Sequence, residues 1–187
     1  MSEQRTHFDL VVIGGGPGGY ASALYGSAAG MDVALVEMSK IGGTCLHVGC
    51  IPAKELLETA SVLRTVRHAG EFGVNTSEAT LDLSKTMERK QSVIDQLTKG
   101  VVGLLDRREV TIFNGIGSLS ANRKINIQAT DGSKTHITGD NIILASGSKP
   151  RTIPGFEIDG DLILTSEELL SMTTIPKSVA IIGGGAI

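Results

Sequence analysis

Residues 8–19 read FDLVVIGGGPGG, an apolar run that passes directly into a glycine-rich turn. The apolar run is short and rich in β-branched residues, which is typical of a buried parallel strand. The turn contains the pattern G-x-G-x-x-G at Gly14, Gly16 and Gly19, with Pro17 inside it. These glycines permit a tight turn and a close approach of the backbone to a pyrophosphate, which sits on the N-terminus of the following helix.

The segments after this turn complete a strand–helix–strand unit. Residues 21–29 are small and predict a helix that packs closely on a sheet, and Gly30 ends it. Residues 32–36 predict the next strand, which is followed by Glu37. An acidic residue at this place accepts hydrogen bonds from the ribose hydroxyls of a dinucleotide. The order of elements predicts an α/β protein with a Rossmann-like dinucleotide-binding fold, and by itself it does not distinguish FAD from NAD.

The two cysteines of the chain lie five positions apart in residues 42–54, GGTCLHVGCIPAK. A bridge between Cys45 and Cys50 would close a small loop, so it would add little stability and, if strained, would be easily reduced. Pro52 predicts a helix that begins near Cys50, where the helix dipole favours a thiolate. The pattern therefore indicates a redox-active dithiol. A structural disulfide is disfavoured because there is no secretory signal, and a metal site because His47 is a single imidazole without a second ligand pair.

This segment resembles the active-site signature of the flavin-dependent pyridine nucleotide–disulphide oxidoreductases, and among them that of the dihydrolipoamide dehydrogenases, GGTCLNVGCIPSK. His47 stands where that family has Asn, and Ala53 where it has Ser. The resemblance implies that FAD is the cofactor, that Cys45 exchanges with the substrate and that Cys50 lies beside the flavin. It also places Lys54 near the flavin ring, whereas without the resemblance Lys54 is an exposed lysine on a helix.

Other cofactor-binding residues follow from the same resemblance. The family has a glycine that brings main chain to the adenine side of FAD, and the resemblance assigns this role to Gly117. Residues 141–150, NIILASGSKP, resemble the family's strand that ends in A-T-G-S-x-P. Small residues there let the backbone pass beside the cofactor. With the glycine turn and its acidic partner, the predicted cofactor-binding residues are Gly14, Gly16, Pro17, Gly19, Glu37, Gly43, Thr44, Lys54, Gly117, Ala145, Ser146 and Gly147.

The middle of the chain predicts structural elements. Apolar residues recur at helical spacing in residues 53–68 and 84–107, and we expect both faces to be core. Short strands separated by turns are predicted at residues 110–113, 124–127 and 135–138, with a hairpin turn at Asp131–Gly132. Together the sequence predicts a parallel sheet with helices and a small β-meander.

Residues 178–187, SVAIIGGGAI, repeat the opening strand and glycine turn. They supply Gly183 and Gly185 of a second glycine pattern, which we expect to bind NAD. Because the third glycine does not follow, we expect this chain to be part of a longer enzyme. The predicted division is an FAD-binding domain at 1–150, an interdomain connection at 151–177, and the first strand of an NAD-binding domain at 178–187.

Composition narrows the class of protein. Hydrophobic residues make up 41% of the chain, and the net charge is −3, which gives no reason to expect a nucleic-acid partner. No apolar run has transmembrane length and there is no signal peptide, so we expect no membrane partner and a cytoplasmic location.

By resemblance, we expect the whole enzyme to be a homodimer that oxidises dihydrolipoamide to lipoamide with NAD+. Its partner would be the lipoyl domain of a 2-oxo acid dehydrogenase complex or of the glycine cleavage system. Two alternatives stay open: a related mercuric- or glutathione-type disulfide reductase, and an FAD-binding module without turnover.

Overall fold

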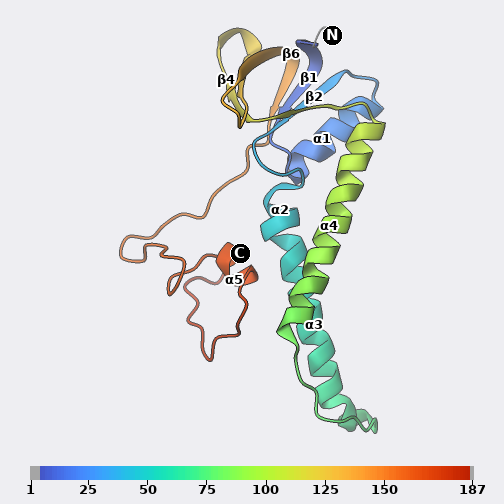
Figure 1. Ribbon diagram of the computed structural model, residues 1–187, viewed down its shortest axis with the longest axis vertical. Helices are drawn as coiled ribbons and strands as arrows, with labels where there is room; N and C mark the ends of the chain where they lie inside the picture. The colour runs from blue at the N-terminus through green and yellow to red at the C-terminus, as the bar shows by residue number, and fades with distance from the viewer. Residues whose placement is uncertain (1–4, 186–187) are drawn as a thin grey trace. The chain divides into compact units, whose positions relative to one another are not determined.

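The computed structural model describes residues 5–185, and the chain forms two compact units. The first contains the residues up to His47 together with Gln96–Ser148, and the second contains Val48–Asp95 together with the residues from Lys149 on. The strands, α-helices and two 3-10 helices (η1 and η2) are, in chain order, β1 (His7–Ile13), α1 (Pro17–Ala28), β2 (Val33–Glu37), α2 (Gly43–Val48), α3 (Cys50–His68), η1 (Ala69–Phe72), α4 (Leu83–Arg107), β3 (Thr111–Asn114), β4 (Ile116–Leu119), η2 (Ala121–Arg123), β5 (Lys124–Gln128), β6 (Lys134–Leu144) and α5 (Ser166–Leu170) (Figure 1).

The first unit is built on one six-stranded sheet with the order β3-β2-β1-β6-β5-β4. β1 pairs in parallel with β2 and β6, and β2 pairs in parallel with β3. β5 pairs antiparallel with β4 and β6. This mixed sheet, parallel around β1 with a short antiparallel extension, confirms the predicted Rossmann-like α/β fold.

Two details of the strand prediction were wrong. Residues 135–138 and 141–144 belong to one strand, β6, whose first part pairs with β5 and whose second part pairs with β1. The strand continues because β1 offers backbone partners to the residues after 138. In addition, the strand predicted at residues 110–113, which forms β3, lies at the parallel edge of the sheet beside β2 and not in the antiparallel part. The antiparallel part contains β4 instead, which was not predicted. The predicted turn at Asp131–Gly132 does connect β5 and β6, with Gly132 at φ 83°.

Side chains alternate between the two faces of the sheet, and each face is covered by different elements. Leu10 and Val12 of β1 belong to a cluster with residues of α1 and of the second half of α4, including Leu105. Val11 and Ile13 belong to the opposite cluster, where the antiparallel strands supply the cover through residues that include Ile125, Ile127 and Ile137. The core therefore lies on both faces of β1 and β2. This packing holds the carboxyl ends of the two strands in place at one edge of the sheet.

The second unit contains α3, the first part of α4 and α5. Arg89 Nε of α4 lies 3.1 Å from Glu55 Oε2 of α3. Lys90 of α4 is buried, and its Nζ donates a 2.7 Å hydrogen bond to the carbonyl of Leu170 at the end of α5. Burial lowers the pKa of this lysine. α5 begins with a capping box in which the carboxylate of Glu168 accepts from the backbone N–H of its N-cap residue, 2.7 Å away.

The strand predicted at 178–187 is not formed over residues 178–185, and this prediction was wrong for those residues. Val179 and Ile181 are exposed there. A strand needs a neighbour to pair its backbone groups, and none of β1–β6 pairs with this segment. Residues 186 and 187 lie outside the described residues, and the predicted domain boundaries stay predictions. Within residues 5–185, no helix has the length and apolar character needed to span a bilayer.

Candidate functional site

The carboxyl ends of the parallel strands bring several predicted cofactor residues together in the first unit. Gly14 follows β1, and its N–H donates to Val36 O of β2 at 2.8 Å. Ala145 follows β6, and its N–H donates to Ile13 O of β1 at 2.8 Å. In open parallel sheets, ligands bind in the crevice outside these strand ends, where neighbouring connections leave in opposite directions. Here the chain continues from β1 to β2 and β3 on one side of β1, and β6 lies on its other side, so the strand order reverses at β1.

The glycine turn is closely packed at its first and third glycines and less closely packed at its second. Gly14 has φ 105°, and a Cβ built on it would lie 2.1 Å from Ala145 O. A Cβ on Gly19 would lie 1.7 Å from Gly14 O. By contrast, a Cβ on Gly16 would have Gly43 Cα as its nearest atom, at 3.9 Å. The first glycine lets the turn pack against the end of β6, and the third lets α1 begin close to the turn. A Cβ at the second would make only an ordinary contact.

The N-terminus of α1 fits the phosphates of a dinucleotide. Gly16 is its N-cap residue and makes no side-chain cap, Pro17 opens the helix, and the first turn carries no acidic side chain. The first N–H groups of a helix have no intrahelical acceptor, and the helix dipole makes this end favourable for an anion. A glycine at the N-cap and a helix end without a side-chain cap together suit a pyrophosphate group.

Glu37 is buried at the end of β2, and its carboxylate reaches the glycine turn. Oε2 accepts from the N–H of Gly15 at 2.5 Å, and Oε1 accepts from the N–H of Ser39 at 2.7 Å. An ionised carboxylate has about four acceptor positions, so about two stay available for ribose hydroxyls. The predicted ribose contact stays a prediction. Sequence reasoning missed that Glu37 also braces the turn, because the pattern only indicates an acid at the end of a strand.

The other predicted cofactor residues of the first unit surround this turn in different ways. Gly43 has φ 57°, and its Cβ would lie 2.6 Å from Gly16 Cα, so the start of α2 packs directly on the turn. A Cβ on Gly117 would lie 3.0 Å from Val36 Cγ1, which means that this glycine lets β4 pack closely over β2. Thr44 beside the turn is exposed, as are Ser146 and Gly147, which follow the half-buried Ala145.

The two cysteines lie on consecutive helices that belong to different units. Cys45 is half-buried in α2, in the first unit. Cys50 is exposed and is the first residue of α3, in the second unit, with Gly49 as N-cap and no side-chain cap. The helix start is therefore where Pro52 indicated it. Lys54 is exposed one turn later, on the same face of α3 as Cys50 because residues four apart are neighbours on a helix surface.

Helix α2 was not predicted, because its six residues are too few to show an apolar period. Leu46 of α2 is buried, and a Cβ on Gly42 would lie 2.3 Å from its Cδ2. His47 Nε2 lies 2.8 Å from Ile41 O. These contacts hold α2 against the segment that precedes it.

The second glycine pattern does not form a comparable site. Gly183 and Gly185 are exposed, and a Cβ on either would have no atom within 4 Å. Without a strand before it, this turn is not positioned for a pyrophosphate. The described residues therefore fit one dinucleotide, at the first turn, and do not fit a second. Among residues 5–185, no three His, Cys, Asp or Glu side chains gather into a metal site.

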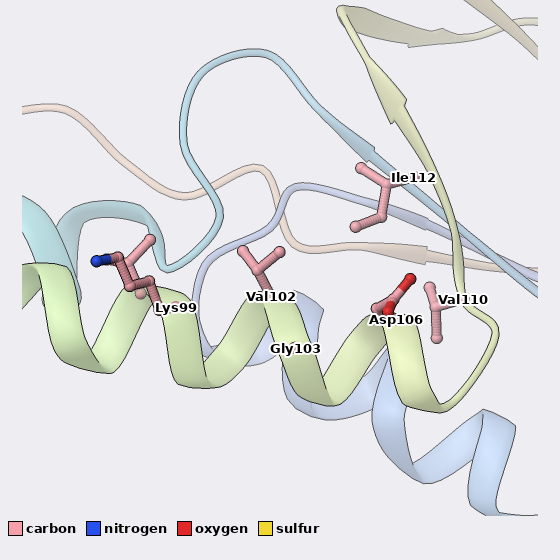
Figure 2. Close-up of a pocket in the computed structure, with 7 residues that line it drawn as sticks. Lys99, Val102, Gly103, Asp106, Val110 and Ile112 are labelled. Atoms are coloured by element: carbon pink, nitrogen blue, oxygen red, sulfur yellow. The ribbon is translucent and has the colours of Figure 1, made fainter.

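An open pocket of about 610 Å³ lies on another part of the first unit, between α4 and β3. Figure 2 shows Val102 and Asp106 on the side of α4 that faces Val110 and Ile112. Lys99 lies at its other end. None of the predicted site residues lines this pocket, and its one lysine and one aspartate offer no cradle for a phosphate. The strand ends around the glycine turn, and not this pocket, form the candidate site.

A parallel sheet, a glycine turn at a helix N-terminus and a buried acid at the end of the second strand define a Rossmann-like dinucleotide-binding domain. The Cys-x4-Cys segment that follows narrows this class. Residues 8–187 match the family of the pyridine nucleotide-disulphide oxidoreductases, and the chain belongs to that family. The resemblance stated from the sequence is confirmed.

Similar proteins agree with this assignment. The chain is 40% identical to a dihydrolipoyl dehydrogenase of Bacillus subtilis over 97% of its own length, and 43% identical to one of Chlorobaculum parvum over 96%. A solved structure of LpdA from Mycobacterium tuberculosis superposes with a TM-score of 0.82 at 25% identity, covering 91% of this chain and 38% of that one. The chain spans 40% of the Bacillus protein and 38% of the Chlorobaculum protein.

Proposed function

We propose that this chain is the FAD-binding part of a dihydrolipoyl dehydrogenase, which oxidises dihydrolipoamide to lipoamide with NAD+. The observation that carries the proposal is the placement of the dithiol segment. Helix α2, which holds Cys45, packs on the dinucleotide turn through Gly43, and Cys50 opens the next helix. The 40% identity to a dihydrolipoyl dehydrogenase over nearly the whole chain supports the substrate class.

The proposed chemistry is a thiol–disulfide exchange between substrate and protein. One thiolate of dihydrolipoamide attacks the Cys45 sulfur of a Cys45–Cys50 disulfide, the protein S–S bond breaks, and Cys50 leaves as a thiolate. The second substrate thiolate then attacks the substrate sulfur of the mixed disulfide, which closes lipoamide and releases Cys45 as a thiolate. Two electrons pass from the substrate to the protein, which is left with two thiolates, and the two protons of the substrate thiols are released to the surroundings. FAD, when bound, supplies a two-electron acceptor for that dithiol.

The chain's own residues hold the cofactor and set the charge around it in this proposal. The α1 N-terminus would bind the pyrophosphate, and Glu37 would accept from ribose hydroxyls. Lys54, one turn along α3 from Cys50, would place a positive charge near the flavin ring. The second glycine pattern, at Gly183 and Gly185, would contribute to NAD binding only in the whole protein, where a strand would have to form before it. We propose that the whole protein is a cytoplasmic homodimer that serves lipoyl domains of a 2-oxo acid dehydrogenase complex or the glycine cleavage system.

The test uses the full-length protein with Cys50→Ser, which keeps the size of the side chain and removes its redox chemistry. We expect FAD to stay bound and the dihydrolipoamide:NAD+ activity to fall by about a hundredfold or more, because a serine at this position cannot form the protein disulfide that the substrate attacks. Cys45→Ser is the matched variant at the other sulfur and has the same expected loss. Activity that survives in either variant contradicts the dithiol mechanism.

The alternative activities are separated by substrate. Assays of the wild-type protein with glutathione disulfide and with mercuric ion, each with a reduced pyridine nucleotide, test for the related reductases. Turnover with either and not with dihydrolipoamide would replace the proposed substrate. A protein that binds FAD and turns over none of the three is a binding module.

A further inference from the structure

The segment between β2 and α2 links the dinucleotide turn to the helix that carries Cys45. The N–H of Gly42 donates to Gly15 O, in the turn, at 2.8 Å. Ile41 is buried in the cluster that covers one face of the sheet. A Cβ on Gly15 would lie 2.9 Å from Ile41 Cδ1, so this side chain fills the space directly beside the turn. Residues 41 and 42 therefore cannot shift without moving the turn.

Helix α2 holds the same two residues from the other side. Leu46 is buried over Gly42, where a Cβ would meet its Cδ2 at 2.3 Å. His47 Nε2 lies 2.8 Å from the carbonyl oxygen of Ile41. A carbonyl oxygen only accepts, so Nε2 carries the proton and donates. The apolar contact of Leu46 sets how closely α2 approaches, and the directional bond of His47 sets its orientation.

We propose that His47 is a positioning residue for the dithiol: its Nε2–H bond to Ile41 O fixes the rotation of α2 and thereby the direction in which Cys45 faces relative to the dinucleotide turn. This inference rests on the proposed function. His47 stands where the resembling family has Asn, whose donor is one bond closer to the backbone. The bond to Ile41 O is thus a feature of this chain and not a copy of the family signature.

The test is the rate at which iodoacetamide alkylates Cys45, followed by mass spectrometry of the reduced, flavin-loaded protein. His47→Leu has a similar size and no donor, and His47→Gln keeps a donor with a similar reach. Losing one intramolecular hydrogen bond corresponds to about a two- to tenfold change in the population of the locally open state. We expect Cys45 alkylation to rise by about that factor in His47→Leu and to stay within about twofold of wild type in His47→Gln.

His68→Leu is the matched control, because His68 Nδ1 also lies 2.8 Å from a carbonyl, that of Arg64, but within a single helix. It should leave Cys45 alkylation unchanged. The proposal is overturned if Cys45 in His47→Leu is alkylated at the wild-type rate, or if Cys45 in His47→Gln is alkylated as fast as in His47→Leu. If His47→Leu does not fold, His47→Gln tests the proposal: its Cys45 should be alkylated within about twofold of the wild-type rate, and a larger increase would overturn the proposal.

This experiment is independent of turnover. Alkylation needs neither dihydrolipoamide nor NAD+, so a failure of the proposed activity would appear in the Cys50→Ser assay and not here. A purely structural role for the ring would be seen in thermal stability and would not be restored by glutamine.

Discussion

The close packing at the third glycine of the turn makes a sharp prediction for Gly19→Ala. An alanine methyl there would lie 1.7 Å from the carbonyl oxygen of Gly14, whereas ordinary van der Waals contact begins at 3.4 Å. The backbone must therefore open by about the difference, roughly 1.7 Å. Gly14 cannot move freely, because it packs against the backbone of Ala145, where a Cβ on Gly14 would lie 2.1 Å from the carbonyl oxygen. Overpacking against backbone costs about 3 kcal/mol, the upper end of the usual range.

Gly18→Ala is a control on the same helix. The nearest atom to its added methyl is Ala145 Cβ at 3.9 Å, which is an ordinary contact. Both substitutions reduce the freedom of the unfolded chain equally and raise helix propensity to a similar extent. The difference between the two variants therefore isolates the clash with Gly14.

The assay is thermal unfolding by calorimetry together with a flavin titration. For a chain of this length, about 3 kcal/mol corresponds to a fall in Tm of roughly 6–12 °C. We expect that fall in Gly19→Ala with weaker flavin binding, since the opened turn no longer presents its N–H groups to the pyrophosphate. Gly18→Ala should match or slightly exceed the wild-type Tm. Equal melting temperatures for the two variants would refute the reasoning.

Three further predictions concern other contacts. Glu37→Gln replaces the carboxylate that accepts from the Gly15 N–H by an amide with only one acceptor oxygen, so we expect the free energy of unfolding to fall by about 1–3 kcal/mol. Flavin binding, measured by fluorescence titration, should become at least about tenfold weaker, and an unchanged affinity would contradict the ribose contact. Gly139→Ala would place a Cβ 2.7 Å from Val11 Cγ2, so urea unfolding should show a loss of about 1–3 kcal/mol that a second change, Val11→Ala, partly restores. Burial lowers the pKa of Lys90 in the folded protein, so the unfolded chain binds more protons than the folded one as the pH approaches the ordinary value of 10.5, and the free energy of unfolding should rise with pH there. Lys90→Met should remove this rise in urea titrations, and the same dependence of unfolding free energy on pH in both proteins would exclude Lys90 as its source.

The structural elements that depend on a local sequence pattern were the ones best predicted from the sequence. The apolar run before Gly14 and the proline after Cys50 indicated β1 and the start of α3, because a β-branched run and a proline in the first helical turn act within a few residues. The arrangement of the glycine turn was also predictable, since the need for glycine at Gly14 and Gly19 follows from the close approach of main chain that the motif implies.

What could not be predicted depends on residues far apart in the chain. The burial of Lys90 depends on the carbonyl of Leu170, eighty positions later. The continuity of β6 depends on β1, which offers backbone partners to residues 138–144. His47 shows no pattern of its own, because its acceptor is a backbone carbonyl and any residue could supply it. Such contacts leave no trace in periodicity or composition.

The double pairing of β6 has a consequence for the growing chain on the ribosome. β1 is the central strand of the parallel part, yet one of its two neighbours is supplied by residues 138–144. The carbonyl oxygen of Asp9 accepts a hydrogen bond from the side-chain amide of Asn141, 132 positions later in the chain. At a synthesis rate of about 5–20 residues per second, one edge of the first strand stays unpaired for roughly 7–26 s after it is made. The dinucleotide turn that follows β1 is thus translated well before the strand that completes its surroundings.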